Sequence, residues 1–357
     1  MPRPIVPGPC LFVLTALVSL PIGPRPAAGQ VFVNFETPHV RPLEITPDRT
    51  RLLAVNTADN RLEVFTIGAE GTLTPTASIP VGLDPVSVRA RNNTEAWVVN
   101  SISDSISIVD LTALNVRQTL KAGDEPADVV FAGSPQRAFV SVAQENAVLV
   151  FDPSNLGAVP VRLNIQGEEP RSLATDGVNV YAAVFESGNK TTILSQQTVS
   201  TSVNPYAGDP NPPPNAGAGF SPPIAPGLPP APAVSLIVKK DSGGAWRDDN
   251  NGNWSAAVTW GLHDQDVAII NASTLGVSYA AGLMNLNMAI CIGPLGRVMV
   301  VGTDATNQVR FEPNVKSTFV RVMMASFSPG SPGTAALTDL NPHLVPYTGR
   351  QVPQATR

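Results

Sequence analysis

Hydrophobic residues along this chain fall in short runs separated by polar turns, and the same arrangement returns about every 43 residues. Three consecutive copies begin at residues 51, 95 and 137 and read RLLAVNTADNRLEVF, EAWVVNSISDSISIVD and RAFVSVAQENAVLVFD. A weaker copy, NVYAAVFESGN, begins at 179, and a clear one, RVMVVGTDATNQVRF, begins at 297. Because self-similarity at a fixed period is the signature of a repeat architecture, we expect one array of structural units.

Each unit consists of two apolar runs that flank a polar turn, which predicts a β-hairpin. A proline-led strand precedes the first four hairpins, and these prolines, Pro42, Pro85, Pro126 and Pro170, are 43, 41 and 44 residues apart. A fourth short strand follows each early hairpin. Four strands in about 43 residues are the dimensions of a β-propeller blade, whereas a β-solenoid has shorter rungs. The sequence therefore predicts an all-β β-propeller with about five recognisable blades, and an incomplete seven-bladed ring is one interpretation of that number.

The pattern also sets boundaries. Residues 1–29 predict an export signal peptide, because Arg3 precedes a short apolar core and small residues precede Gln30; an uncleaved anchor is the alternative. We expect an exported protein, periplasmic or at the cell surface, with no membrane span in the mature chain. Blades occupy residues 30–333, and residues 334–357 predict an irregular connection. Since no final blade is evident for closing a ring, we interpret the chain as an N-terminal portion of a longer protein.

The fourth unit is interrupted after KTTIL, which ends at residue 194, by an insertion over residues 196–262. Its first part, 203–232, contains eleven prolines and predicts an extended segment without a packed core. Its second part, 233–262, predicts a projecting hairpin. Long insertions of this kind commonly carry binding functions.

Composition narrows the classes of function. Charged residues make up 14% of the chain and the formal net charge is −5, so nucleic acid is not an expected partner. The two cysteines are Cys10, inside the signal, and Cys291, in the apolar run MAICIG, where we expect a buried side chain. None of the three histidines has a partner at metal-ligand spacing, and we assign no catalytic residue.

Acidic residues precede three of the blade-opening prolines. Asp84, Glu125 and Glu169 lie in loops that would converge on one mouth of the propeller channel, where carboxylates can hold calcium. Solvated acidic turns are the alternative, because the first and fifth units break the pattern. The DDNNGN turn at 248–253 also permits a calcium site, although a polar hairpin turn explains it without one. The metal therefore stays unknown at this stage.

Tryptophans gather in the insertion. Trp246, Trp254 and Trp260 can anchor a protein partner or a sugar ring if they are exposed. The alternative is that they form the separate hydrophobic core of a small hairpin.

The runs LLAVNTADNRLEVF and AWVVNSISDSISIVDLTALNV resemble the YVTN family of β-propeller repeats, which are WD40-like repeats. The resemblance covers residues 40–195 and 264–325. It implies the propeller fold, while the function stays open, since such propellers occur in exported surface proteins, in lactonase-like enzymes and beside cytochrome domains. The resemblance also implies that longer forms carry covalent haem, but this chain has no Cys-x-x-Cys-His motif, so we expect no covalent haem here.

Three hypotheses follow. The first is an exported, non-catalytic binding scaffold for a protein, glycan or small ligand, without a cofactor in this chain. The second is the propeller portion of a larger cytochrome c-type redox protein whose haem domain lies elsewhere. The third is a lactonase-like hydrolase with a cation at the channel mouth, which predicts loss of activity when Glu125 or Glu169 is replaced by alanine.

Overall fold

The structure is a computed structural model, and it describes residues 38–202, 235–248, 251–262, 264–305 and 320–344. Every described residue belongs to one compact unit, residues 36–357. The predicted signal peptide, 1–29, and the proline-rich segment, 203–232, lie outside the described residues.

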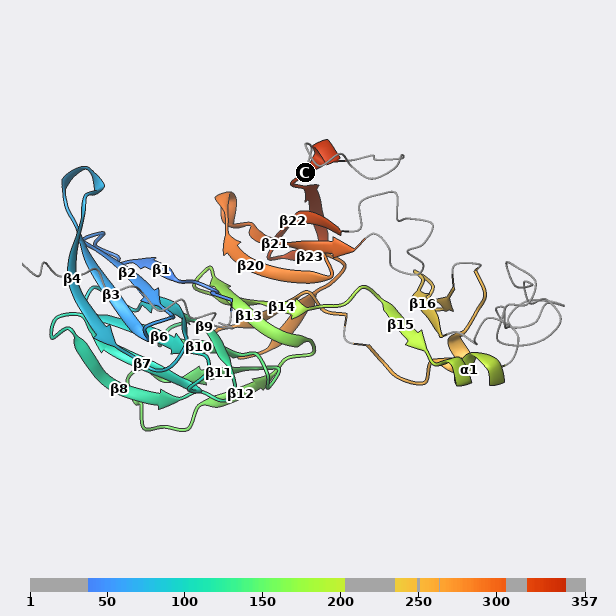
Figure 1. Cartoon of the computed structure of the whole chain (residues 1–357), viewed down its shortest axis with the longest axis horizontal. Coiled ribbons are helices and arrows are strands. Elements are labelled where there is room, and N and C mark those ends of the chain that lie inside the picture. The colour runs from blue at the N-terminus through green and yellow to red at the C-terminus, as the bar shows by residue number, and fades with distance from the viewer. Residues whose placement is uncertain (1–37, 203–234, 249–250, 263, 306–319, 345–357) are drawn as a thin grey trace, which may run out of the picture. The chain divides into compact units, whose positions relative to one another are not determined.

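The first three repeats fold as separate four-stranded antiparallel sheets, and within each sheet the strands lie in chain order. The first blade comprises β1 (Leu43–Ile45), β2 (Arg51–Asn56), β3 (Arg61–Ile67) and β4 (Leu73–Pro80). The second comprises β5 (Pro85–Ala90), β6 (Glu95–Asn100), β7 (Ser105–Asp110) and β8 (Asn115–Lys121). The third comprises β9 (Pro126–Ala132), β10 (Arg137–Val142), β11 (Ala147–Phe151) and β12 (Val161–Asn164). Figure 1 shows β4, β8 and β12 at the outside of this part of the chain, and β1 and β9 further in.

The fourth and fifth blades share one sheet because a single residue pair, Glu186 and Leu286, joins them. The fourth comprises β13 (Glu168–Thr175), β14 (Asn179–Glu186), β18 (Val267–Asn271) and β19 (Val277–Ala280). The fifth comprises β20 (Leu286–Ile292), β21 (Val298–Ala305), β22 (Val320–Ser328) and β23 (Ser331–Asp339). Five blades are thus present in the described part of the chain, consistent with an incomplete β-propeller, as the repeat pattern predicts.

The expected boundary at residue 333 was wrong. Strand β23 continues to Asp339 because its backbone pairs with β22 as far as Met323, so the first part of the segment 334–357 belongs to the fifth blade. Its sequence, SPGTAALTD, has Pro332 and Gly333 near its start, which are uncommon in strands, and most of its side chains are exposed, as expected at the edge of a sheet.

The insertion forms a small module of its own. Strand β14 pairs directly with β18, so β15 (Thr191–Leu194) leaves the blade and pairs with β16 (Leu236–Lys240), which pairs with β17 (Trp246–Arg247). A short helix, α1 (Gln196–Thr201), is capped by the Ser195 hydroxyl, which accepts a hydrogen bond from the Thr198 amide. Single 3₁₀ turns lie at Ala69–Gly71, Ser255–Ala257, Pro294–Gly296 and Pro342–Leu344. We call β15, α1, β16, β17 and the described residues from 251 to 262, which include the turn at Ser255–Ala257, the insertion module.

Neighbouring blades bury one another. In each blade we call the face toward the next blade the leading face, and the face toward the previous blade the trailing face. Trp97, on the leading face of the second blade, packs edge-on against Phe131 and Phe151 of the third, with ring centroids 5.3 and 6.3 Å apart. Adjacent residues of β6 therefore enter different cores, since Val98 packs toward the first blade. Burial on both faces explains why the apolar runs are continuous instead of alternating.

Cys291 was expected to be buried, and this was wrong. It is exposed, because it lies on the leading face of the fifth blade, over which the described residues place no further blade. Among the described residues no helix is long and apolar enough to cross a membrane.

Candidate functional site

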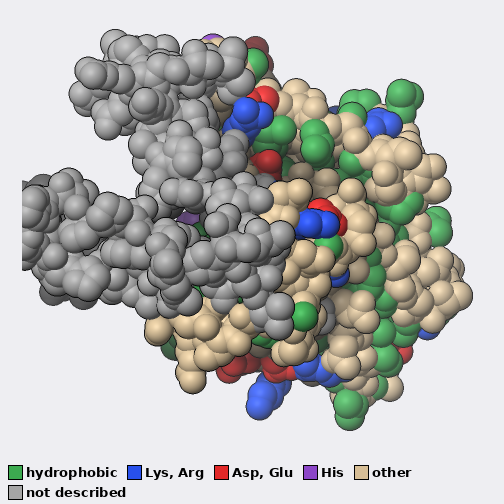
Figure 2. Space-filling view, turned by 90° about the vertical axis from the view of Figure 1, so that its right-hand side faces the viewer, with side chains coloured by type: hydrophobic (Ala, Val, Ile, Leu, Met, Phe, Trp, Pro, Cys, Tyr) green, Lys and Arg blue, Asp and Glu red, His purple; other side chains and the backbone are tan. Residues whose placement is uncertain are grey.

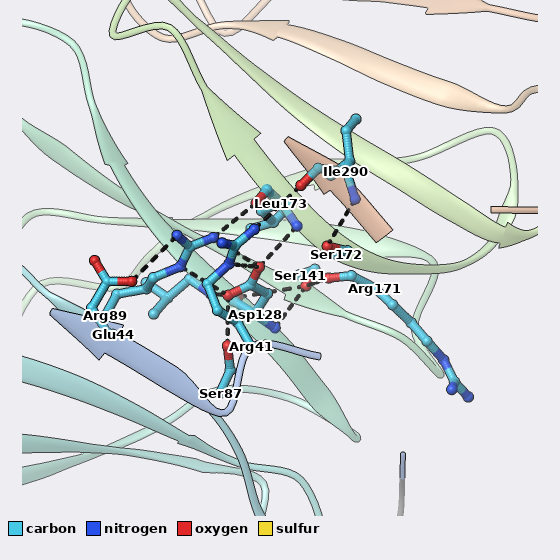
Figure 3. Close-up of polar contacts among 11 residues, drawn as sticks. Arg41, Glu44, Ser87, Arg89, Asp128, Ser141, Arg171, Ser172, Leu173 and Ile290 are labelled. Carbon is cyan, nitrogen blue, oxygen red and sulfur yellow. Dashed lines mark hydrogen bonds and ion pairs between the residues drawn. The ribbon is translucent and has the colours of Figure 1, made fainter. Parts of the chain in front are cut away.

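The inner strands of the blades carry a cluster of charged side chains centred on Asp128 of β9 (Figure 3). Its side chain is fully buried. Oxygen Oδ1 accepts hydrogen bonds from the Ser87 hydroxyl (2.7 Å) and the Val129 amide (2.8 Å), and Oδ2 accepts one from the Leu173 amide (2.9 Å). These donors belong to the second, third and fourth blades. One carboxylate therefore links three blades.

Arg89 of β5 is the counter-charge. Its Nη2 donates to Asp128 Oδ2 at 3.2 Å and to the Leu173 carbonyl at 2.9 Å, while Nη1 lies 3.8 Å from Glu44 Oε2. The side chain is only 15% exposed. Charge-assisted hydrogen bonds in such surroundings are stronger than neutral ones, and they fix the relative position of the two strands.

The first and fifth blades reach the same cluster through Arg41, which lies just before β1. Its Nη2 donates to the Ile290 carbonyl of β20 at 3.2 Å, and its Nε lies 4.0 Å from Asp128 Oδ2, an ion-pair distance that is too long for a hydrogen bond. Burial, and then the neighbouring Arg89, lower the pKa of Arg41. Burial raises the pKa of Glu44, against the effect of Arg89 and Arg41.

We call Arg41, Glu44, Arg89 and Asp128 the axial cluster. It contains two cationic and two anionic groups, and the Asp128 carboxylate already accepts from several donors. A carboxylate in this state is poorly placed to act as a general base or a metal ligand, because its lone pairs are in use. The cluster is suited to holding the inner strands together.

The acidic loops show a second repeated device. Asp84, Glu125 and Glu169 each adopt a left-handed φ, of 57°, 51° and 58°. Their amides donate to the side-chain oxygen of the hairpin-turn residue of the preceding blade, in the pairs Asp84 with Asn60 (2.7 Å), Glu125 with Asp104 (3.3 Å) and Glu169 with Asn146 (2.9 Å). These turn residues also have positive φ. The loops are therefore tied to the blade before them.

The three carboxylates face different surroundings. Asp84 is buried, whereas Glu125 is half-buried. Glu169 accepts a hydrogen bond from Gln144 and pairs with Arg171 Nη2 at 2.7 Å. Within the described ranges, no three His, Cys, Asp or Glu residues are gathered closely enough to hold a metal ion.

The turn at 248–253 is held together by its own groups. The Asp248 carboxylate accepts hydrogen bonds from the Gly252 amide and from the indole Nε1 of Trp254, both at 2.8 Å. Residues 249 and 250 lie outside the described residues.

The three tryptophans of the insertion are placed differently. Trp246 and Trp254 are 6% and 2% exposed and pack with Leu194, Val199 and Val238 in the core of the insertion module. Trp260 is 42% exposed, and its Nε1 donates to Thr192 Oγ1 at 3.2 Å. Trp260 alone of the three presents a large part of its ring to a partner.

Sequence reasoning missed the axial cluster. A signal was present in PLEIT, PVSVRA and PADVVF, where Glu44, Arg89 and Asp128 interrupt inner strands that are otherwise apolar. Charged residues at buried strand positions require partners, so these three residues predict one another once the strands are known to converge.

No protein-family model matches this chain, and no curated protein matches its sequence. Among solved structures, hydrazine synthase of Kuenenia stuttgartiensis is similar, with 14% sequence identity and a TM-score of 0.52 over 88% of this chain and 69% of that one. A Bacteroides uniformis protein provisionally assigned as a 6-phosphogluconolactonase aligns over 84% of this chain and 83% of its own at 12% identity, with a TM-score of 0.40. At such low identity the likeness to hydrazine synthase shows the β-propeller fold alone.

Proposed function

We propose that this chain is an exported β-propeller of YVTN-type repeats that acts as a non-catalytic scaffold and binds a protein partner through its insertion module. The signal-like segment at residues 1–29 supports export, and the repeat sequences support the YVTN assignment. The blades supply a rigid base, because each packs on the next and the axial cluster joins their inner strands.

The observation that carries the proposal is the contrast among the tryptophans. The insertion module buries Trp246 and Trp254 in its own core, yet Trp260 remains 42% exposed, as does Leu262 two residues later in the sequence. A hydrogen bond to Thr192 on β15 holds the Trp260 indole in place. Tryptophan is enriched among the residues that carry most of the binding energy in protein interfaces, so a partly exposed tryptophan held by a hydrogen bond supports a protein-binding role.

The proposal is tested by site-specific photo-crosslinking in cells that produce the protein. A photoreactive amino acid replaces Trp260, and the matched control carries it at Val159, which is 91% exposed in the third blade and far along the chain from the insertion. We expect one discrete covalent adduct from position 260 and none of that size from 159. If position 260 gives no adduct, or both positions give the same products, the insertion module is not the binding element.

The two alternatives remain separate proposals with their own tests. A cytochrome-type assembly requires a haem domain joined to this propeller, which the mass and the visible absorption of the protein purified from its source would reveal. A lactonase-like hydrolase with a calcium ion requires calcium to raise the Tm of the protein, and Glu125→Ala to remove that rise. A scaffold shows neither effect.

A further inference from the structure

A cavity of about 440 Å³ lies where loops of three blades meet. Arg91 comes from the β5–β6 turn of the second blade, Gln136 and Arg137 from the β9–β10 hairpin of the third, and Leu275 from the β18–β19 turn of the fourth. The β11–β12 connection of the third blade, residues 152–160, supplies another side. Small-molecule sites commonly have volumes of about 300–1,000 Å³. The cavity contains no residue of the insertion module, so what it binds is independent of the proposed function.

The β11–β12 connection is long for this fold. It has nine residues, 152–160, whereas the matching connections of the second and fourth blades, 111–114 and 272–276, have four and five. Its start is folded by its own bonds, because the Asp152 carboxylate accepts hydrogen bonds from the Ser154 hydroxyl at 2.6 Å and the Ser154 amide at 2.8 Å. Long connections on a rigid scaffold commonly carry binding residues.

Apolar side chains form part of the cavity wall. Val150 and Phe151 are each 5% exposed, while Val161, which pairs with Val150, is 51% exposed and Val159 is 91% exposed. The face in Figure 2 also shows hydrophobic side chains at the surface, and single exposed ones are ordinary in soluble proteins. Here the exposed valines line a cavity, and its wall can therefore cover the apolar part of a ligand.

Two guanidinium groups line the same cavity, and both are held in place. Arg91 Nε donates to Gln136 Oε1 at 3.0 Å, and its Nη1 donates to Glu95 Oε1 at 3.1 Å. Arg137 Nη1 donates to two backbone carbonyls of the fourth blade, at 2.8 and 3.0 Å. Neither Nη2 has an acceptor among the described residues. Each arginine therefore keeps donors for an acceptor in the cavity.

The charges around the cavity favour an anion. Asp152 is the one carboxylate among the described residues that line it, and hydrogen bonds from the Ser154 hydroxyl and amide lower its pKa. Glu95 lies outside the lining and is shared between Arg91 and Arg117. The lining thus holds two arginines against one aspartate, an excess of positive charge.

We propose that this cavity binds a small organic anion, a carboxylate attached to an aromatic or branched aliphatic body. Arg91 and Arg137 donate to the carboxylate, because the planar fork of a guanidinium matches the two carboxylate oxygens. Phe151, Val161 and Leu275 contact the apolar body. Since the second, third and fourth blades all contribute, the ligand binds only when these blades are packed together, and its binding stabilises that packing.

The test is isothermal titration calorimetry of the purified full chain with cinnamate, an aromatic carboxylate. Two matched probes separate the parts of the site, since cinnamamide lacks the charge and acetate lacks the apolar body. We expect cinnamate to bind saturably at one site per chain, and cinnamamide to bind about tenfold or more weakly because it loses charge-assisted hydrogen bonds. Acetate is expected to give no measurable binding. An exposed apolar surface elsewhere would bind the two aromatic probes alike.

Variants of the lining locate the site. Arg91→Gln is expected to weaken cinnamate binding about tenfold or more. The matched control Arg117→Gln removes the other arginine that pairs with Glu95 but lies outside the cavity, so binding is unchanged. Val161→Asp adds a second carboxylate to the lining and is expected to weaken binding to a similar extent. Its control is Leu73→Asp, at a 46% exposed position of the outer strand of the first blade.

The outcomes separate cleanly. The proposal is overturned if cinnamate does not saturate the protein up to about 10 mM, or if it binds no better than cinnamamide. Equal affinities of Arg91→Gln and Arg117→Gln for cinnamate also overturn it. If Arg91→Gln fails to fold, Val161→Asp against Leu73→Asp gives the same decision, because the Val161 side chain is half exposed and tolerates a polar replacement.

Discussion

Replacing Asp128 by asparagine keeps the shape of the side chain and removes its charge. Arg89, only 15% exposed, then retains Glu44 at 3.8 Å as its nearest carboxylate. The new amide group also competes with the donors that Ser87 and the Leu173 backbone direct at this position. The variant thus leaves a cation largely buried and several donors poorly matched.

The magnitude follows from the burial of this pair. Removing one partner of a buried ion pair costs about 3–5 kcal/mol, because the remaining charge is uncompensated. A domain of this kind has a total stability of roughly 5–15 kcal/mol, so the loss is a large fraction of it. At about 2 °C for each kcal/mol in a domain of this size, the Tm falls by about 6–10 °C.

The assay is calorimetric unfolding of wild type, Asp128→Asn and the control Asp124→Asn, whose side chain is exposed in the loop before β9. The control is expected to change stability by no more than about 0.5 kcal/mol. In the double variant Asp128→Asn/Arg89→Met the unpaired guanidinium is gone, and part of the loss is expected to return. If Asp128→Asn destabilises the protein no more than Asp124→Asn, the axial cluster does not hold the blades together.

Three further predictions concern single groups. Burial raises the pKa of Glu44 in the folded state, so the stability of the protein falls as pH rises from the ordinary glutamate pKa through the folded value. The free energy of unfolding, measured with urea at a series of pH values, should fall less over this range for Glu44→Gln than for wild type. Burial alone would raise the pKa of Asp176, but hydrogen bonds from the Asn179 amide, the Tyr181 hydroxyl and the Val178 amide lower it. The stability that the ionised Asp176 contributes is therefore lost as pH falls through its folded pKa. In the same urea experiments, Asp176→Asn should lose stability less steeply than wild type below about pH 4. Asn146→Gly, which suits the left-handed φ but removes the acceptor of the Glu169 amide, should cost about 1 kcal/mol in denaturant unfolding.

The repeat pattern predicted the strands because residues at fixed places in each unit mark where strands begin and end. Pro85 and Pro126 begin β5 and β9, and Pro170 lies within β13, so the proline spacing marks the inner strands. The acidic residue that ends the third strand is explained as well. Asp110 and Asp152 accept hydrogen bonds from amides two residues later, which closes the turn to the outer strand.

Features that occur once could not be predicted in this way. Ser87 and Asp128 occupy equivalent positions in their strands, yet only one is charged, and the Leu173 amide that binds Asp128 lies 45 residues further along the chain. Cys291 was misassigned because its exposure depends on a neighbouring blade and not on its own apolar run. The same reasoning applies to β15, whose sequence TTIL suits a blade, although its partner is β16.

The two kinds of contact in this fold have different consequences. Apolar packing between blades is non-directional, and the leading and trailing faces of successive blades resemble one another closely enough that packing alone distinguishes them weakly. The bonds of Asp128 are directional and join a hydroxyl of β5 and an amide of β13. The axial cluster therefore specifies which inner strands meet, while the blade faces supply most of the stability. We therefore expect Asp128→Asn to loosen the inner strands. Relative to wild type, amide hydrogen exchange should accelerate more in β5 and β13 than in β2 and β3.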